Sequence, residues 1–260
     1  MAQQAQFDLV IIGSGPGGYV AAVRASQLGL KTAVVEKNAR LGGVCLNVGC
    51  IPSKALLDSS EYYHLAKERF AEYGIKTGKV SLDLAAMLAR KDKVVEELTE
   101  NVRKLLEGNN IEIVQGTATI SAPGTVEIDT GKKKKTTLAA KNILLATGSA
   151  PIEVKGLEFD GKHIVSSTEA LSFDTVPKHL GIVGGGYIGL ELGSVWNRLG
   201  SKVTVIEMLP KIATTLDGQV GRTLDRILKR QGLEFKLNTK VAEATVARGK
   251  VRTVLESGDN

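Results

Sequence analysis

The chain has 260 residues, of which 43% are hydrophobic and 24% are charged, as in ordinary globular proteins. Disorder is therefore not expected, and no apolar run approaches the ~18 residues that a membrane span needs. The net charge is +6, but the excess is scattered apart from four lysines at 132–135, which we interpret as a solvated hairpin tip. Because only 4% of residues are aromatic and able to stack on bases, we expect no nucleic-acid partner. The lack of a long apolar run leads us to expect no membrane partner.

The N-terminus carries neither the basic nor the apolar segment of a signal peptide, so we expect a cytoplasmic protein. The only two cysteines, Cys45 and Cys50, are too few for a disulfide scaffold and too few for a zinc site. We therefore expect no metal. A close cysteine pair in a cytosolic chain favours redox chemistry over a structural role.

The first predicted element is a buried strand at residues 7–13. Three glycines in G-x-G-x-x-G spacing follow it: Gly13, Gly15 and Gly18. A helix is predicted over 19–28, and a second strand over 32–36 ends in Glu36. In such a unit the glycines allow a tight turn and a close approach of the backbone to a pyrophosphate, and the acid binds the ribose hydroxyls. The pattern predicts a dinucleotide-binding βαβ unit.

The segment 42–54 contains both cysteines and three glycines. Pro52 suits the first turn of a helix, so Cys50 is expected at a helix N-terminus, where the dipole stabilises a thiolate. Lys54 follows one turn later. A regular helix holds residues five apart too far from each other for a disulfide, so bonding of Cys45 to Cys50 would need the irregular backbone that the glycines permit.

A long helix is predicted over 84–107, with Asp83 as its N-cap and Gly108 as its stop. Its apolar residues form one stripe: Leu84, Met87, Leu88, Val95, Leu98, Val102 and Leu105. Residues 111–138 predict short strands, and 141–145 predicts a strand that runs into the next turn. Because Pro151 follows that turn, we place a domain boundary near residue 150.

The second half repeats the first unit. Strands at 180–183 and 203–207 enclose a helix that runs to Leu199. The glycines of this copy are Gly184, Gly186 and Gly189. Gly184 lies 171 residues after Gly13, and Glu207 lies 171 residues after Glu36. Glu207 favours NAD over NADP, because a carboxylate repels a 2′-phosphate. The fold class predicted is α/β, with two Rossmann-like dinucleotide-binding domains at 1–150 and 151–260.

The run C-L-N-V-G-C-I-P-S-K at 45–54, between two such units, resembles the flavin-dependent pyridine nucleotide-disulfide oxidoreductases. Within that family it is most similar to the members that oxidise dihydrolipoamide. The resemblance covers essentially the whole chain and implies the FAD/NAD(P)-binding fold. It implies that residues 1–150 form an incomplete FAD-binding domain and residues 151–260 an incomplete NAD-binding domain.

The resemblance also implies roles for individual residues. Cys45 would exchange with the substrate thiol, Cys50 would face the flavin, and Lys54 paired with Glu191 would lie beside flavin N5. The residues implied for FAD are Gly13, Gly15, Gly18, Glu36, Lys37, Gly43, Lys54, Gly116, Ala118, Thr147, Gly148 and Ser149. The residues implied for NAD are Gly184, Gly186, Tyr187, Gly189, Glu207 and Val241, with Tyr187 covering the nicotinamide pocket.

Simpler interpretations exist for several of these residues. Glu191 could only complement a helix dipole, Lys54 could be an ordinary surface lysine, and Tyr187 could be a packing residue. Cys45 and Cys50 could be inert buried thiols. At the level of the whole chain, the alternatives are a sibling disulfide or mercuric reductase that uses NADPH, or a non-catalytic FAD-binding redox module.

One family feature is absent. The family carries a C-terminal dimerisation domain with a His-x-x-x-x-Glu acid–base pair, whereas the only histidines here are His64, His163 and His179, and none is followed by Glu five residues later. The chain therefore resembles about the first half of such an enzyme, and we expect it to be inactive alone. The implied partners are the acyltransferase cores of 2-oxo-acid dehydrogenase complexes, the glycine-cleavage carrier protein, and a second copy of the full-length chain.

Overall fold

The computed structural model describes residues 6–131 and 135–257. The residues cluster into two compact units, Met1–Pro52 with Asp92–Ala150, and Ser53–Lys91 with Pro151–Asn260. The cofactor-based division into 1–150 and 151–260 stays a prediction, and residues 53–91 group with the later part of the chain. The predicted hairpin tip falls mostly on residues 132–134, which lie outside the described residues.

The first unit is built on a six-stranded sheet with the order β3-β2-β1-β6-β5-β4. Its strands are β1 (Phe7–Ile12), β2 (Thr32–Glu36), β3 (Glu112–Gln115), β4 (Thr117–Ala122), β5 (Thr125–Asp129) and β6 (Thr136–Leu145). β1 pairs in parallel with β2 and β6, and β2 pairs in parallel with β3. β4 and β5 continue from β6 as an antiparallel meander, so β6 belongs to both halves of the sheet.

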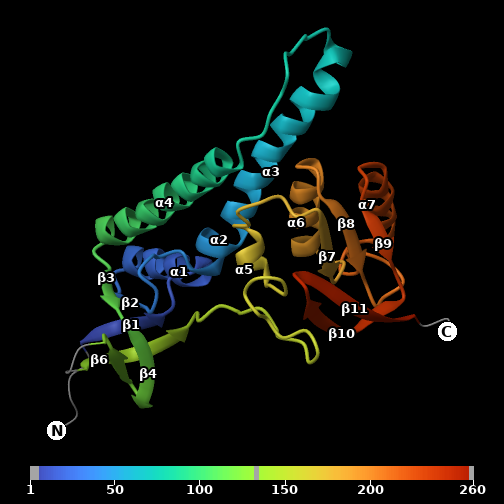
Figure 1. Cartoon of the computed structure of the whole chain (residues 1–260). Coiled ribbons are helices and arrows are strands. Elements are labelled where there is room, and N and C mark those ends of the chain that lie inside the picture. Colours follow the sequence, from blue (N-terminus) through green and yellow to red (C-terminus); the bar gives the residue numbers. More distant parts are fainter. Residues whose placement is uncertain (1–5, 132–134, 258–260) are drawn as a thin grey trace. The chain divides into compact units, whose positions relative to one another are not determined.

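Helices α1 (Pro16–Gln27) and α4 (Leu84–Gly108) cover one face of the parallel strands (Figure 1). The core on this face includes Ile11, Ala22, Val34, Val102 and Leu106. Strands β5 and β6 supply side chains to the opposite core, which includes Phe7, Val10, Val35, Val126 and Ile128. α1 begins three residues earlier than predicted, because Pro16 fits the first helical turn.

The apolar stripe of α4 was predicted correctly except at its end. The Asp83 carboxylate accepts the N–H of Ala86 at 2.9 Å, which confirms the predicted cap. Leu105 is 43% exposed, and Leu106 is fully buried in its place. Val95, Val102 and Leu106 are buried, and the first and last of them are eleven positions apart, which is close to three turns at 3.6 residues per turn. Because seven residues are slightly less than two full turns of an α-helix, residues chosen at seven-residue steps rotate gradually away from the buried face over this length.

Two consecutive helices carry the cysteines. α2 (Gly43–Val48) contains Cys45, and α3 (Cys50–His64) begins at Cys50. This confirms the predicted helix start at the second cysteine. Gly49 separates the helices with a φ of −140° and a ψ of −115°, which is the irregular backbone that the sequence permitted. α3 continues through a π-helical turn, η1 (Leu65–Arg69), into a 3₁₀ turn, η2 (Phe70–Tyr73).

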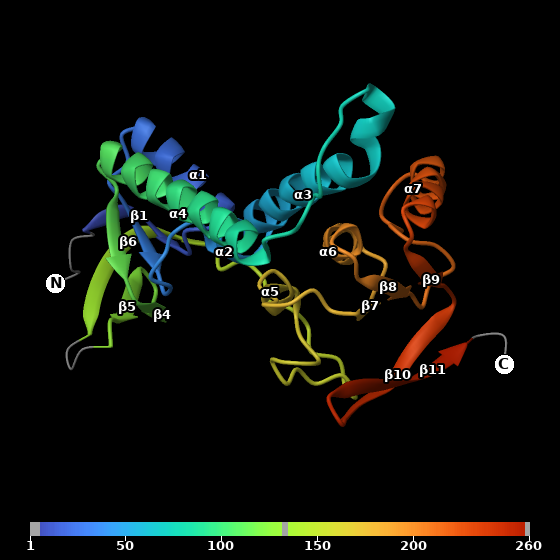
Figure 2. The same ribbon diagram turned by 45° about the horizontal axis from the view of Figure 1, so that its top comes forward.

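The second unit contains a parallel sheet with the order β7-β8-β9 and a separate antiparallel hairpin. Its strands are β7 (His179–Val183), β8 (Lys202–Ile206), β9 (Glu234–Lys236), β10 (Thr239–Ala247) and β11 (Lys250–Ser257), and its helices after α3 are α5 (Ser167–Ala170), α6 (Tyr187–Arg198) and α7 (Gly218–Arg230). Figure 2 shows α6 and α7 on one side of these strands and the hairpin on the other. The predicted α/β class with two βαβ units is confirmed.

The two faces of this smaller sheet have separate cores. Leu190 of α6 and Leu228 of α7 pack on Val203 and Val205 of β8. On the other face Ile206 packs against the hairpin through Val241. Among the described residues, no helix is long and apolar enough to cross a membrane.

Candidate cofactor and redox site

Four parallel strands of the first unit end at one edge of the sheet, where ligands bind in open α/β folds. Gly13 follows β1, Glu36 ends β2, Gly116 follows β3, and Thr147 follows β6 by two residues. The loops are hydrogen-bonded to their neighbours, since the Gly116 N–H donates to the Glu36 carbonyl at 2.8 Å. Four of the predicted FAD residues are therefore brought together at one edge from four separate segments, whereas Lys54 belongs to the second unit and Ala118 lies within β4.

The Glu36 carboxylate is buried at this edge and held by four hydrogen bonds. One oxygen, Oε2, accepts the Ser14 N–H at 3.0 Å and the Ser14 hydroxyl at 2.6 Å. The other, Oε1, accepts the N–H and the side-chain amide of Asn38 at 2.9 and 3.0 Å. Burial alone would raise the pKa of Glu36, but the bonds from Ser14 and Asn38 outweigh it and hold the pKa below its ordinary value. The group is an ionised acceptor, as a ribose hydroxyl requires.

Two glycines of the loop after β1, Gly13 and Gly18, have no room for a side chain. Gly13 has a φ of +104°, and a Cβ on Gly18 would collide with the Gly13 carbonyl oxygen. A Cβ on Gly43 would lie 2.6 Å from the Cα of Gly15. No side chain caps α1 at Gly15. Pro16 has no N–H and the Gly18 N–H donates to the Gly15 carbonyl at 2.8 Å, so in the first turn the N–H of Gly17 remains for a phosphate. These residues fit the diphosphate of a dinucleotide.

The second unit repeats this arrangement at the offset of 171 residues. Glu207 Oε2 accepts the Gly185 N–H at 2.6 Å, and Oε1 accepts the Leu209 N–H at 2.8 Å. Gly184 has a φ of +100°, close to that of Gly13. The repeat therefore extends from the sequence pattern to individual hydrogen bonds, and the second loop fits a second nucleotide.

The two cysteines differ in their position within a helix and in their exposure. Cys45 is half-buried within α2, and Cys50 is exposed at the first residue of α3. Asn47 ties α2 to the preceding loop, because its side-chain amide donates to the carbonyls of Leu41 and Gly43, both at 2.9 Å. Because Cys50 is exposed and Cys45 only half-buried, the interpretation that both are buried thiols is excluded. The redox-active disulfide between them stays a prediction.

Lys54 and Glu191 form an ion pair within the second unit. The Lys54 Nζ lies 2.7 Å from Oε1 and 2.8 Å from Oε2 of Glu191. The Ser53 hydroxyl donates to Oε2 at 3.2 Å. Lys54 is thus not an isolated surface lysine, and Glu191 does more than face a helix dipole. The position of the pair beside a flavin stays a prediction.

The remaining predicted residues occupy varied positions. Tyr187 is the first residue of α6 and is 71% exposed, so it is not a packing residue in this structure. Val241 is buried in β10 against Leu157 and Ile206, so only its backbone remains for a cofactor contact. Ala118 lies in β4 opposite Ile128. Lys37, Gly148 and Ser149 are exposed in the loops after β2 and β6.

Sequence reasoning missed the residues that hold the predicted ones in place. Ser14 and Asn38 orient Glu36, and Ser53 reaches Glu191. The Gln115 side chain donates to the carbonyls of Glu36 and Asn38 at 2.9 and 2.6 Å. Comparing the two copies position by position would have pointed to Ser14, which is equivalent to Gly185. Nothing in the local pattern points to Gln115.

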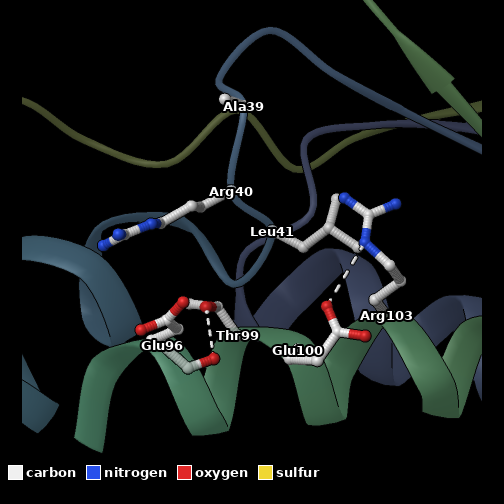
Figure 3. A pocket seen from close by; sticks show the side chains of 7 residues that line it. All are labelled: Ala39, Arg40, Leu41, Glu96, Thr99, Glu100 and Arg103. Carbon is white, nitrogen blue, oxygen red and sulfur yellow. Dashed lines mark hydrogen bonds and ion pairs between the residues drawn. The ribbon is translucent and has the colours of Figure 1, made fainter. Parts of the chain in front are cut away.

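A separate cleft of about 360 Å³ lies between the loop 39–41 and α4 (Figure 3). Its polar lining carries both signs of charge, from Arg40, Glu96, Glu100 and Arg103. Arg103 pairs with Glu100 at 3.7 Å, while Arg40 points away from Arg103. None of the predicted site residues lines this cleft.

Comparison with known proteins found a family profile, curated relatives and solved structures that are similar to this chain. The sequence profile of the pyridine nucleotide-disulphide oxidoreductases matches residues 7–260. Leghemoglobin reductase of Vigna unguiculata is 50% identical over 96% of this chain and 48% of its own length. The mitochondrial dihydrolipoyl dehydrogenase of Pisum sativum is 48% identical over 96% of this chain and 50% of its own length. The HOCl-induced flavoprotein disulfide reductase of Escherichia coli has a TM-score of 0.79 at 28% identity, covering 96% of this chain and 53% of that one.

Two glycine-rich nucleotide loops and a cysteine pair at a helix start are together typical of dinucleotide-dependent disulfide oxidoreductases. The chain belongs to the pyridine nucleotide-disulphide oxidoreductase family. Membership of this family implies binding of FAD and of a pyridine nucleotide. The chain spans about half the length of the curated relatives that it matches.

The expectation of a cytoplasmic location is wrong. Dihydrolipoyl dehydrogenases that are named as mitochondrial resemble this chain, including those of Pisum sativum and Dictyostelium discoideum. The expectation rested on the lack of a secretory signal peptide in the sequence. That pattern excludes only one of the routes by which a protein leaves the cytosol.

Proposed function

We propose that the protein containing this chain is a dihydrolipoyl dehydrogenase, which oxidises protein-bound dihydrolipoamide to lipoamide with NAD⁺. The observation that carries the proposal is the placement of Cys50 at the first residue of α3, with Cys45 in the preceding helix and the Lys54–Glu191 ion pair one turn further on. The named dihydrolipoyl dehydrogenases among the relatives support this choice within the family.

In the proposed reaction, a substrate thiolate attacks Cys45 Sγ of the oxidised pair and breaks its bond to Cys50. The second substrate thiol then displaces Cys45 from the mixed disulfide, which releases lipoamide. Cys50 remains as a thiolate, stabilised by the N-terminus of α3. When bound, FAD accepts the two electrons of the dithiol, and NAD⁺ receives them as hydride.

Each nucleotide has its own set of residues in this proposal. Residues 1–150 hold FAD through the loop at Gly13 and the Glu36 carboxylate, and residues 151–260 hold NAD through the loop at Gly184 and Glu207. The acyltransferase cores of 2-oxo-acid dehydrogenase complexes and the glycine-cleavage carrier protein would present the substrate. The full-length protein would act as a homodimer.

The test uses the FAD-loaded protein in two anaerobic half-reactions followed by flavin absorbance. Dihydrolipoamide and NADH should each bleach the flavin of the unaltered protein. Cys45→Ser should abolish bleaching by dihydrolipoamide and retain bleaching by NADH, because hydride transfer needs no cysteine. Faster turnover of NADPH with glutathione disulfide or Hg²⁺ than of dihydrolipoamide with NAD⁺ would assign the protein to a different branch of the family.

A further inference from the structure

Two ion pairs join α3 to α6, and they are seven residues apart on each helix. Lys54 Nζ lies 2.7 Å from Glu191 Oε1, and Arg198 Nη2 lies 2.6 Å from Glu61 Oε2. Because the pairs follow one another in the same order on both helices, α3 and α6 run in the same direction here. Figure 1 shows the two helices side by side. Seven residues of helix place the pairs roughly 10 Å apart along the axis.

The order of charge is reversed between the helices. Along α3 the lysine comes first and the glutamate second, whereas along α6 the glutamate comes first and the arginine second. A shift of one helix by seven residues would place Glu61 against Glu191, or Lys54 against Arg198. Packing in the opposite direction would bring both like-charged pairs together. The four charges therefore favour one alignment and penalise the alternatives.

The Arg198 pair is held more firmly than the Lys54 pair. The Arg198 side chain is only 17% exposed, and its guanidinium also lies 3.5 Å from the Leu57 carbonyl and 3.4 Å from the Ser60 hydroxyl. Lys54, in contrast, is 55% exposed. An exposed ion pair between flexible side chains holds its own geometry weakly. Arg198 is thus the stronger anchor of α6 on this face of α3.

We propose that Arg198, through Glu61, is a positioning residue that sets the register of α6 on α3 and so keeps Glu191 on the Lys54 ammonium. The inference rests on the proposed function in one respect, because that function places the Lys54–Glu191 pair beside the flavin. Arg198 touches neither the substrate nor a cofactor in this account. It acts through the helix that carries Glu191.

The experiment measures two properties of the FAD-loaded protein that do not depend on turnover of dihydrolipoamide. The first is the reduction potential of the flavin. The second is the acetylation rate of Lys54 by acetic anhydride, quantified by mass spectrometry against Lys141, which pairs with Asp8 in the other unit. Arg198→Gln should raise the relative rate at Lys54 by about two- to fivefold, the range that a partly exposed ion pair supports. It should shift the potential in the same direction as Glu191→Gln.

A double-variant cycle separates positioning from general damage to the fold. In the Glu191→Gln background, Arg198→Gln should change neither readout further, because the pair that it positions is already gone. Glu61→Gln leaves the Arg198 side chain in place and should cause smaller changes of the same sign in both the Lys54 acetylation rate and the flavin potential. Exchanging the charges, with Glu61→Arg and Arg198→Glu together, should restore both readouts at least in part.

Arg90 supplies a matched control on the other side of α3. It lies 2.7 Å from the Asp58 carboxylate and also donates to the Ala55 carbonyl and the Ser59 hydroxyl, the same three kinds of group that Arg198 contacts. Arg90→Gln should leave Lys54 acetylation and the flavin potential unchanged.

Two results would overturn the proposal. One is an unchanged Lys54 rate and flavin potential in both Arg198→Gln and Glu61→Gln. The other is an Arg198→Gln effect that adds in full to that of Glu191→Gln. Absence of dihydrolipoamide oxidation with both readouts shifted as expected would instead count against the proposed substrate and leave the positioning role in place.

Discussion

Glu207 binds the backbone N–H of Gly185 at 2.6 Å, so the acid of the second unit is attached to the glycine loop that precedes it by 22 residues. Glu36 binds the N–H of Ser14 in the same way at 3.0 Å. In each unit the carboxylate is thereby oriented before any nucleotide arrives. Such preorganisation favours binding, because less side-chain freedom is lost on association.

The choice of nicotinamide cofactor is predicted to depend on Glu207. Its carboxylate would accept a hydrogen bond from the ribose 2′-OH of NAD and repel the 2′-phosphate of NADP. Glu207→Gln in the FAD-loaded protein should narrow the preference for NADH over NADPH by about tenfold, or roughly 1.4 kcal/mol. The measurement is the ratio of kcat/KM for flavin reduction by the two cofactors.

Glu243→Gln is a suitable control for this change, because Glu243 is an exposed acid on β10 of the same unit. It should leave the ratio as it is. An equal ratio in the unaltered protein and in Glu207→Gln would show that the discrimination comes from another residue.

The two cysteines are predicted to give different spectra. Cys45→Ser should show a long-wavelength charge-transfer band without added reductant, because Cys50 is then a thiolate at the start of α3 next to the flavin. Cys50→Ser should lack this band after two-electron reduction. Visible absorbance of the FAD-loaded variants is the measurement, and a band in reduced Cys50→Ser would reverse the two roles.

The stability of the first unit is predicted to fall in acid through Glu36. The pKa of this buried carboxyl lies below its ordinary value of 4.5, because hydrogen bonds from Ser14 and Asn38 outweigh the effect of burial. Its contribution to stability is therefore fully present above about pH 4.5 and is lost as the pH falls through the lowered pKa. Urea unfolding at pH 6 should show Glu36→Gln to be less stable by about 1–3 kcal/mol.

This difference should shrink as the pH is lowered from 6 towards 3, because the unaltered carboxyl then becomes neutral as well. A difference that stays constant over this range would mean that the charge of Glu36 contributes nothing to its hydrogen bonds.

Adjacent glycines in α1 are predicted to differ in their tolerance of alanine. A Cβ on Gly18 would collide with the Gly13 carbonyl oxygen, whereas a Cβ on Gly17 has no atom within 4 Å. Gly18→Ala should destabilise the protein by roughly 1–3 kcal/mol, by displacing the loop, and should weaken retention of FAD. Gly17→Ala should be neutral, or stabilising by up to about 1 kcal/mol, because alanine favours a helix. Thermal unfolding measures both, and equal effects would contradict the packing argument.

Much of the fold could be predicted because the chain repeats one pattern twice. The strands that end at Glu36 and Glu207, and the glycine loops before them, follow from local hydrophobic period and from the constant offset. The burial of Leu106 rather than Leu105 did not follow, because it depends on the rotation of a long helix against its sheet. A seven-residue stripe approximates that rotation only over short lengths.

The site was predicted less completely than the fold. Glycines and acids in a motif could be identified because the chemistry of a dinucleotide requires them at fixed spacing. Residues such as Gln115 and Arg198 act through contacts between segments that are far apart in the sequence. Their side chains carry no local pattern, so only the folded structure shows which groups they hold.

One of the differences between the two glycine loops, Ser14 in the first against Gly185 in the second, affects how firmly each loop is held. Ser14 adds a hydroxyl that donates to Glu36 at 2.6 Å and accepts from the Gly42 N–H at 3.2 Å, whereas Gly185 has no side chain with which to do this. The Ser14 carbonyl accepts the Gly42 N–H at 3.1 Å and the Gly185 carbonyl accepts the Ala213 N–H at 2.8 Å, so the backbone holds both loops and only the first has additional hydroxyl contacts. In the proposed reaction FAD stays bound through every cycle, while the nicotinamide must leave once per cycle. Slow dissociation of the nucleotide is therefore compatible with catalysis at the first loop, whereas the second loop must release its nucleotide quickly.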